Sequence, residues 1–175
     1  MGIKYLKVRD RKIKLQIWDT AGQERYKAIS NSYYQGSIAA FLVYDITDRT
    51  SFTNIEKILN DLIFEKPEYT IVIVGNKSDL LAERKVSFEE GLRFAKKNDS
   101  LFFETSAKDE KSNIEQIFFE ATQSILAKID SKIIDLNSGN HAIKLGNLPL
   151  IDLLQTDSND NFARKKNSSF CCSFN

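Results

Sequence analysis

An acid, a glycine and a glutamine follow one apolar segment closely enough in the sequence to bind the same charged ligand. Leu15 and Ile17 are typical of the end of a buried strand, and Asp19 follows them. Ligands of α/β proteins bind at the carboxyl ends of sheet strands, where a carboxylate can hold Mg²⁺ through its water shell. Gly22 lets a backbone N–H approach such a ligand, and Gln23 can hold a water molecule by donating and accepting together. Taken singly, these residues would also suit an ordinary turn.

The whole string Trp-Asp-Thr-Ala-Gly-Gln-Glu-Arg, residues 18–25, resembles the switch II segment of Ras-like small GTPases. Neighbouring segments are similar to signatures of the Rab branch, namely residues 14–18, 25–26, 33–36 and 42–47. The resemblance extends from residue 2 to about residue 129. It implies a GTP/GDP switch in vesicle-mediated membrane traffic, with hydrolysis by attack of water on the γ-phosphate. In that switch Gln23 would be catalytic and orient the water, Asp19 would hold Mg²⁺ through water, and the Gly22 N–H would sense the γ-phosphate.

Two further strings that follow apolar strands resemble the guanine-recognition motifs of the family. With Gly22, the nucleotide-binding residues that the resemblance implies are Asn76, Lys77, Asp79, Ser106, Ala107 and Lys108. Asp79 would accept hydrogen bonds from the ring N–H and the exocyclic amine of guanine, and the Ala107 N–H would meet O6. Adenine cannot supply both donors to a buried Asp79, so we expect adenine to be rejected. Either string alone would be no more than a solvated turn.

The phosphate-binding part of such a site is absent from the 175 residues. A P-loop requires Gly-x-x-x-x-Gly-Lys-Ser/Thr, and none of the seven glycines is followed by lysine. The family's switch I threonine would lie just upstream of Gly2. We therefore expect an N-terminally truncated chain that begins at an internal methionine and lacks the first strand, the P-loop, the first helix and switch I, roughly 30 residues or more. Base contacts alone would give roughly millimolar affinity.

This gap leaves two functional hypotheses open. Without the phosphate-binding part, we expect the chain as it stands to hold GTP poorly and to turn it over negligibly. If an upstream exon was omitted from the sequence, the GTPase interpretation of the complete protein remains intact. The alternative is a non-catalytic, membrane-anchored Rab-like binding module with little or no nucleotide turnover, which engages its partners through Trp18, Tyr26 and Ile29. In both cases the family's missing strand would have lain between the strands at 13–18 and 38–44, leaving two strand edges unpaired.

Alternating apolar patterns predict the elements that position these residues. Strands are expected at 3–8, 13–18, 38–44, 70–74 and 101–103, of which the last is expected to be buried, and helices at 24–32, 51–65, 87–97 and 113–134. Ser87 with Glu90, and Asn113 with Gln116, are expected capping pairs. The alternation indicates a Ras-like, doubly wound, mostly parallel α/β sheet with one antiparallel hairpin strand. We expect an incomplete Ras-like domain at 1–134 and a flexible tail at 135–175, where Asn, Ser, Gly and Asp dominate.

Composition narrows the class of protein. The chain has 175 residues, of which 42% are hydrophobic, enough for one domain with a core. A formal net charge of +1 argues against nucleic acid as the main partner. No run approaches the roughly 18 apolar residues of a membrane-spanning helix, and the amino terminus has no signal-peptide core. The two cysteines, Cys171 and Cys172, are adjacent, which excludes a disulfide framework and makes a poor zinc site.

The cysteine pair resembles the double geranylgeranylation site of Rab proteins. Two lipids anchor a protein durably, and the basic residues at 164–166 would favour an anionic leaflet. A disordered end with idle thiols is the alternative. The resemblance implies a monomer on the cytoplasmic face of endomembranes that cycles with the cytosol. Its partners would be the membrane, an exchange factor, a GTPase-activating protein, a GDP-dissociation inhibitor, a Rab escort protein and effectors.

Overall fold

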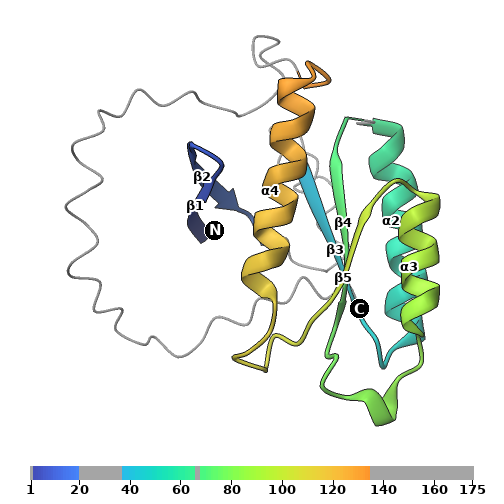
Figure 1. The fold of residues 1–175 in the computed structure, drawn as a ribbon. Coiled ribbons are helices and arrows are strands. Elements are labelled where there is room, and N and C mark those ends of the chain that lie inside the picture. The colour runs from blue at the N-terminus through green and yellow to red at the C-terminus, as the bar shows by residue number, and fades with distance from the viewer. Residues whose placement is uncertain (1, 20–36, 66–67, 135–175) are drawn as a thin grey trace.

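Strands and helices alternate along the chain. A computed structural model describes residues 2–19, 37–65 and 68–134 (Figure 1). In chain order the elements are β1 (Gly2–Val8), β2 (Arg11–Ile17), β3 (Ala39–Asp45), α2 (Arg49–Glu65), β4 (Thr70–Asn76), the 3₁₀ helix η2 (Leu81–Glu83), α3 (Phe88–Lys97), β5 (Leu101–Glu104) and α4 (Ile114–Asp130). The predicted helix at 24–32 and the predicted tail lie outside the described residues. None of the described helices has the length and apolarity needed to span a membrane.

The central layer is a parallel sheet in the order β3-β4-β5. Helices α2 and α3 cover one face of this sheet and α4 covers the other (Figure 1). Alternate residues of β3 therefore enter different cores: Leu42 and Tyr44 pack on the side of α2, and Phe41 and Val43 pack on the side of α4. All seven residues of β4 are buried, as expected for a central strand covered on both faces. The predicted mostly parallel α/β architecture is confirmed.

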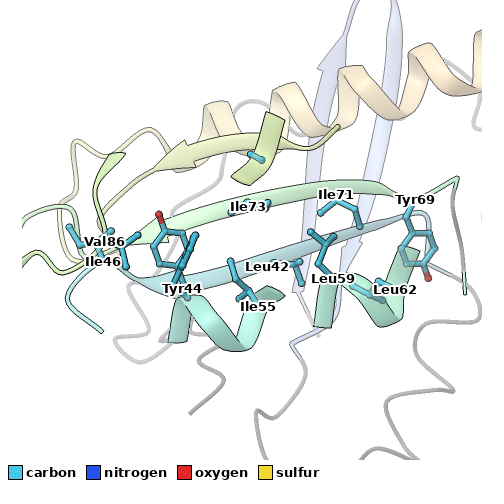
Figure 2. Close-up of a cluster of buried hydrophobic side chains, with 12 residues drawn as sticks. Leu42, Tyr44, Ile46, Ile55, Leu59, Leu62, Tyr69, Ile71, Ile73 and Val86 are labelled. Carbon is cyan, nitrogen blue, oxygen red and sulfur yellow. The ribbon is translucent and has the colours of Figure 1, made fainter. Parts of the chain in front are cut away.

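The larger of the two cores lies between the sheet and α2 (Figure 2). Ile55 and Leu59 of α2 project onto Leu42 and Ile73 of the strands, and all four are almost completely buried. The helix begins at Arg49, two residues before the predicted start, because the Asp48 carboxylate accepts a hydrogen bond from the Thr50 N–H at 2.9 Å. Burial of these side chains is the main force that holds α2 on the sheet.

Strands β1 and β2 form a separate antiparallel hairpin, with Gly2 opposite Ile17 and Val8 opposite Arg11. Among the described strands, none joins this hairpin to β3, in agreement with the gap expected between the two segments. The hairpin lies beside α4 (Figure 1), where Lys4 pairs with Glu115 at 2.7 Å. Arg9 and Arg11 both pair with Asp130 at the other end of the helix, at 3.3 and 2.7 Å.

Two predicted buried strands are only half buried. In β2, exposed residues alternate with partly buried ones, because a two-stranded hairpin has one face toward solvent. Leu15 and Ile17 are therefore intermediate in exposure. Strand β5 is intermediate throughout, since it is the last strand on its side of the parallel sheet within the described residues. The prediction of a buried position was wrong for both strands.

The two predicted capping pairs have different outcomes. The Ser87 hydroxyl accepts a hydrogen bond from the Glu90 N–H at 3.2 Å at the start of α3, as the sequence predicts. Asn113 precedes α4 but makes no side-chain capping bond. The Gln116 amide donates instead to Glu120, one turn further along the helix, at 2.8 Å. A glutamine can bond along the helix as well as back to its cap, and here the i, i+4 partner is preferred.

Helix α4 ends at Asp130, four residues before its apolar pattern ends. Lys132 takes the left-handed conformation, with φ of 59°. Its N–H donates to the Ile129 carbonyl at 3.0 Å, and the Ile133 N–H donates to the Lys128 carbonyl at 2.9 Å. These two bonds form a Schellman motif, which closes a helix by satisfying its last carbonyls. The left-handed position of this motif is usually glycine. Here it is Lys132, so the sequence carries no glycine to mark the end of the helix, and the predicted boundary at residue 134 was too late.

The hydroxyl of Tyr44 is buried in the larger core without a hydrogen-bond partner among the described residues. A Cβ atom added to Gly91 would lie 2.6 Å from this oxygen, and one added to Gly75 would lie 2.9 Å from it. The ring packs edge-on against Phe52, with 4.9 Å between centroids. Burial, and then the negative charge of nearby Glu104, raise the pKa of the Tyr44 hydroxyl, which stays neutral.

We expect Tyr44→Phe to raise the free energy of unfolding by about 1 kcal/mol, because it removes a buried polar atom that makes no hydrogen bond. Urea denaturation of the two proteins measures the difference. Tyr5→Phe is the matched control, since the Tyr5 side chain is exposed and its change should be close to zero. A less stable Tyr44→Phe variant would show that the hydroxyl has a partner.

Candidate functional site

The hydrogen-bonded pairing of β4 with β5 continues past the ends of both strands. In register, Gly75 of β4 lies opposite Glu104 of β5. The Thr105 N–H then donates to the Gly75 carbonyl at 2.9 Å, and the Ser78 N–H donates to the Thr105 carbonyl at 3.0 Å. These bonds fasten together two loops, residues 76–79 and 105–109, which we call the paired loops. The two predicted guanine-recognition strings therefore lie side by side.

Asn76 joins the paired loops through its side chain. Its Oδ1 accepts hydrogen bonds from the Lys77 N–H at 2.8 Å and from the Ala107 N–H at 3.1 Å. The residue is only 7% exposed, so its amide is a fixed part of the loop rather than a mobile surface group. In this structure the Ala107 N–H, which the family resemblance assigns to guanine O6, is bonded to Asn76.

Ser106 links the carboxylate of Asp79 to the backbone of the second loop. Its hydroxyl donates to Asp79 Oδ1 at 2.5 Å and accepts from the N–H groups of Lys108 and Asp109 at 3.2 and 3.3 Å. The donated hydrogen bond stabilises the ionised carboxylate, so the pKa of Asp79 lies below its usual value. Asp79 itself is exposed. The argument that a buried acid rejects adenine therefore requires the base itself to cover this carboxylate.

Lys77 connects the paired loops to the end of the next strand, β3. Its backbone is left-handed, with φ of 65°, and its ammonium lies 2.6 Å from Asp45 Oδ2. Asp45 also accepts from the N–H and the hydroxyl of Thr47, at 2.8 and 2.7 Å. Partial burial raises the pKa of Asp45, but the bonds from Lys77 and Thr47 outweigh it and the net pKa is lowered.

Asp45 was not among the predicted site residues, although the sequence contained a signal for it. It is an acid at the carboxyl end of a parallel strand, the same criterion that singled out Asp19. Three neighbouring strands therefore contribute to this edge of the sheet: β3 through Asp45, β4 through Asn76 and β5 through the loop that begins at Thr105. Such an edge, lined by polar groups with fixed partners, is where α/β proteins bind their ligands.

The remaining predicted site residues are not brought into this arrangement by the described structure. Asp19 is exposed and follows β2, which belongs to the hairpin and not to the parallel sheet. Gly22, Gln23, Cys171 and Cys172 lie outside the described residues. No group of three or more His, Cys, Asp or Glu side chains that could hold a metal ion occurs in the described parts of the chain. The assignment of Asp19 to Mg²⁺ stays a prediction.

Comparison with known proteins gives a consistent match. The model of the Ras family matches residues 1–127. The chain is 46% identical over 131 residues to Ras-related protein Rab-2B of Dictyostelium discoideum, an alignment that covers 74% of this chain and 64% of that protein. It is 40% identical over 158 residues to Ras-related protein Rab-4B of Rattus norvegicus and of Homo sapiens, with 90% of this chain and 74% of those proteins covered. The chain thus spans less than two thirds of the length of the first of these relatives.

We expect Ser106→Ala to raise the pKa of Asp79, because it removes the hydroxyl that stabilises the carboxylate. A pH titration of the Asp79 carboxyl carbon by NMR measures the shift. With its folded pKa lowered, Asp79 contributes stability above the pKa of the unfolded chain, and this contribution is lost as the pH falls through the folded pKa. The variant should therefore lose less stability than the wild type on acidification.

The matched control is Ser112→Ala, which changes a serine just beyond the second loop. Its backbone N–H donates to the Asp109 carbonyl at 3.0 Å, and the substitution leaves that bond in place. The pKa of Asp79 should not change in this control. An unchanged Asp79 pKa in Ser106→Ala would mean that the hydrogen bond does not form in solution.

Proposed function

Because the chain belongs to the Ras family, and within it to the Rab-type small GTPases, we propose that its paired loops recognise the guanine base of GTP and GDP. The observation that carries the proposal is the mutual bonding of Asn76 with Ala107 and of Asp79 with Ser106. The residues of the two pairs are 31 and 27 positions apart in the sequence, respectively, and together they form one hydrogen-bonded unit. Because these loops are already held by internal hydrogen bonds, they lose little conformational entropy when a planar base binds to them.

Asp79 would select guanine through the acceptor sites that Ser106 leaves open. A carboxylate has about four lone-pair sites, and the Ser106 hydroxyl occupies one of them. The ring N–H and the exocyclic amine of guanine can occupy two others. Adenine presents a ring nitrogen lone pair at the position of the guanine ring N–H, so the carboxylate would face an acceptor. With adenine bound, the Asp79 carboxylate would lack the hydrogen bonds that guanine supplies, and the cost of leaving it without them accounts for the preference for guanine over adenine.

Lys77 and Ala107 would complete the base site. The ion pair with Asp45 fixes the end of the Lys77 side chain at the strand edge, so its methylene stem is available to cover one face of the base. Guanine O6 would share the Ala107 N–H with Asn76 Oδ1, which already accepts it. Lys108 contributes through its backbone N–H, which holds the Ser106 hydroxyl in place.

We propose that a protein containing this chain together with phosphate-binding elements acts as a GTP/GDP switch in membrane traffic. The family relationship is the support for this wider role. Gln23 would orient the water that attacks the γ-phosphate, the Gly22 N–H would contact the γ-phosphate, and Asp19 would hold the water shell of Mg²⁺. Loss of the γ-phosphate would release the surrounding segments and change which partners bind, among them the exchange factor, the GTPase-activating protein and the effectors.

Residues 1–134 would form the GTPase part of the chain, and 135–175 would form a tail that ends in the lipid-anchor site. We propose that Cys171 and Cys172 are both geranylgeranylated, with the help of a Rab escort protein. Two such lipids would hold the protein on the cytoplasmic face of endomembranes, and a GDP-dissociation inhibitor would return it to the cytosol. The adjacent cysteines and the basic residues 164–166 are the support for this proposal.

We expect the 175-residue chain to bind guanosine with roughly millimolar affinity and to prefer it to adenosine by about tenfold or more, the equivalent of one hydrogen bond to a charged group. Changes in the amide NMR shifts of residues 76–79 and 105–108 during titration measure both affinities. Asp79→Asn should abolish the preference, because the amide replaces one acceptor by a donor. Glu110→Gln is the control, since this carboxylate is exposed and lies just outside the paired loops. Equal binding of both nucleosides by the wild type would refute the base site.

We expect Cys171→Ser with Cys172→Ser to abolish membrane association in cells, because no lipid can then be attached. Either single substitution should leave weak, reversible binding, since one lipid anchors a protein only marginally. Flotation of membranes from cell extracts measures association, and the mass of the intact protein gives the number of lipids. Ser173→Ala is the control for a nearby change that leaves both thiols. Unchanged flotation of the double variant would exclude a lipid anchor at these residues.

A further inference from the structure

A partly buried ion pair joins the two segments that carry the paired loops. Arg84 donates to Glu104 through both terminal nitrogens, from Nη1 to Oε1 and from Nη2 to Oε2, each at 2.7 Å. Its Nη1 also donates to the Val86 carbonyl at 3.0 Å. The side chains are 21% and 11% exposed, in contrast to the exposed Arg49–Glu90 pair between α2 and α3, whose side chains are 53% and 33% exposed.

Short stretches of hydrogen-bonded backbone connect this ion pair to Asp79 and Ser106, the two residues that bond across the loops. Glu104 lies two residues before Ser106, and the backbone between them is held by the Thr105 N–H bond to Gly75. On the other side, successive turns connect Lys77 to Arg84: the Leu80 N–H donates to Lys77, and the Arg84 N–H donates to Leu81. Both connections are short and carry backbone hydrogen bonds between the ion pair and the loops.

The segment after Arg84 is also anchored, at the end of β3. The N–H groups of Lys85 and Val86 both donate to the Ile46 carbonyl, at 2.8 and 3.1 Å. On the β5 side, the Glu104 side chain lies beside Gly75, where an added Cβ atom would come within 3.1 Å of Glu104 Cγ, so a glycine at this position leaves Glu104 its place. The ion pair therefore fixes the distance between two stretches of backbone that are each held at their other end.

We propose that Arg84 and Glu104 are positioning residues that set the geometry of the Asp79–Ser106 contact and thereby the preference of the paired loops for guanine. This inference rests on the proposed function of those loops. A bidentate guanidinium–carboxylate pair accepts only one relative orientation of its two groups, whereas a single hydrogen bond tolerates many. The short contact between Ser106 and Asp79 depends on that orientation, and so does the direction in which the Asp79 carboxylate faces a base.

The test compares Arg84→Lys and Glu104→Gln with the wild-type chain. Each keeps the approximate size of the side chain: lysine keeps the positive charge but cannot make the two-pronged contact, and glutamine removes the negative charge. Three quantities are measured: the free energy of unfolding in urea, the pKa of the Asp79 carboxyl by NMR, and the dissociation constants for guanosine and adenosine. We expect the pKa of Asp79 to rise and the affinity for guanosine to fall so that part of the about tenfold preference is lost, with the affinity for adenosine unchanged. Arg84→Met should show larger effects in the same directions.

Arg49→Met is the matched control, because it removes an exposed arginine–glutamate pair that joins α2 to α3 and makes no bond to the paired loops among the described residues. It should leave the guanosine-to-adenosine ratio and the pKa of Asp79 at their wild-type values. If Arg84→Met does not fold, the two milder variants still decide the question. Lower stability in them, with an unchanged Asp79 pKa and an unchanged nucleoside ratio, would overturn the inference and leave the pair a purely structural role.

The two proposals fail in different ways. If the wild-type chain binds guanosine no better than adenosine, the proposed base site is wrong, and the pKa of Asp79 in the Arg84 and Glu104 variants alone tests the positioning role. A raised pKa would then support the coupling of the ion pair to Asp79, and an unchanged pKa would refute it. If the wild type prefers guanosine but the variants do as well, the base site stands and the positioning role is refuted.

Discussion

The continuation of the β4–β5 pairing beyond the strand ends is the constraint on which the site depends. Strand β4 is buried along its whole length, so it can carry no charged group until it leaves the sheet. The Thr105 and Ser78 N–H groups then extend the ladder by two more bonds, to Gly75 and Thr105. Because these bonds fix the two loops in register, the polar residues that follow each strand meet at the same level.

Some of the buried polar side chains at this edge of the sheet make hydrogen bonds, and others make none among the described residues. Asn76 and Ser106 are buried and use their side chains to hold backbone N–H groups, which offsets the cost of removing them from water. The hydroxyls of Tyr44 and Thr105 are buried near them but have no hydrogen-bond partner within the described structure. Gly75 passes so close to the Tyr44 hydroxyl that a side chain would displace it. The close packing of the sheet edge thus has a local energetic cost beside the bonds that order the loops.

The sequence was sufficient to predict most of the helices and strands and to predict that the two loops lie next to each other. Hydrophobic periodicity located β3, β4, α2 and α3 within about two residues, because each buries a regular face. It could not locate the end of α4, where the backbone reverses at Lys132 while apolar residues continue. The Arg84–Glu104 and Lys77–Asp45 pairs were not predicted, because each joins polar residues on different elements. Such pairs leave no periodic pattern, and only the fold brings them within bonding distance.

The hairpin of β1 and β2 depends on a different kind of attachment. Within its strands only Val8 is buried, and the bonds to α4 are the ion pairs of Lys4 with Glu115 and of Arg9 and Arg11 with Asp130. Dissolved ions weaken exposed charge pairs while leaving a buried sheet almost untouched. The molecule therefore has two levels of cohesion. Ionic strength acts on the ion pairs between the hairpin and α4, and the exclusion of water acts on the buried Val8 and on β3, β4 and β5.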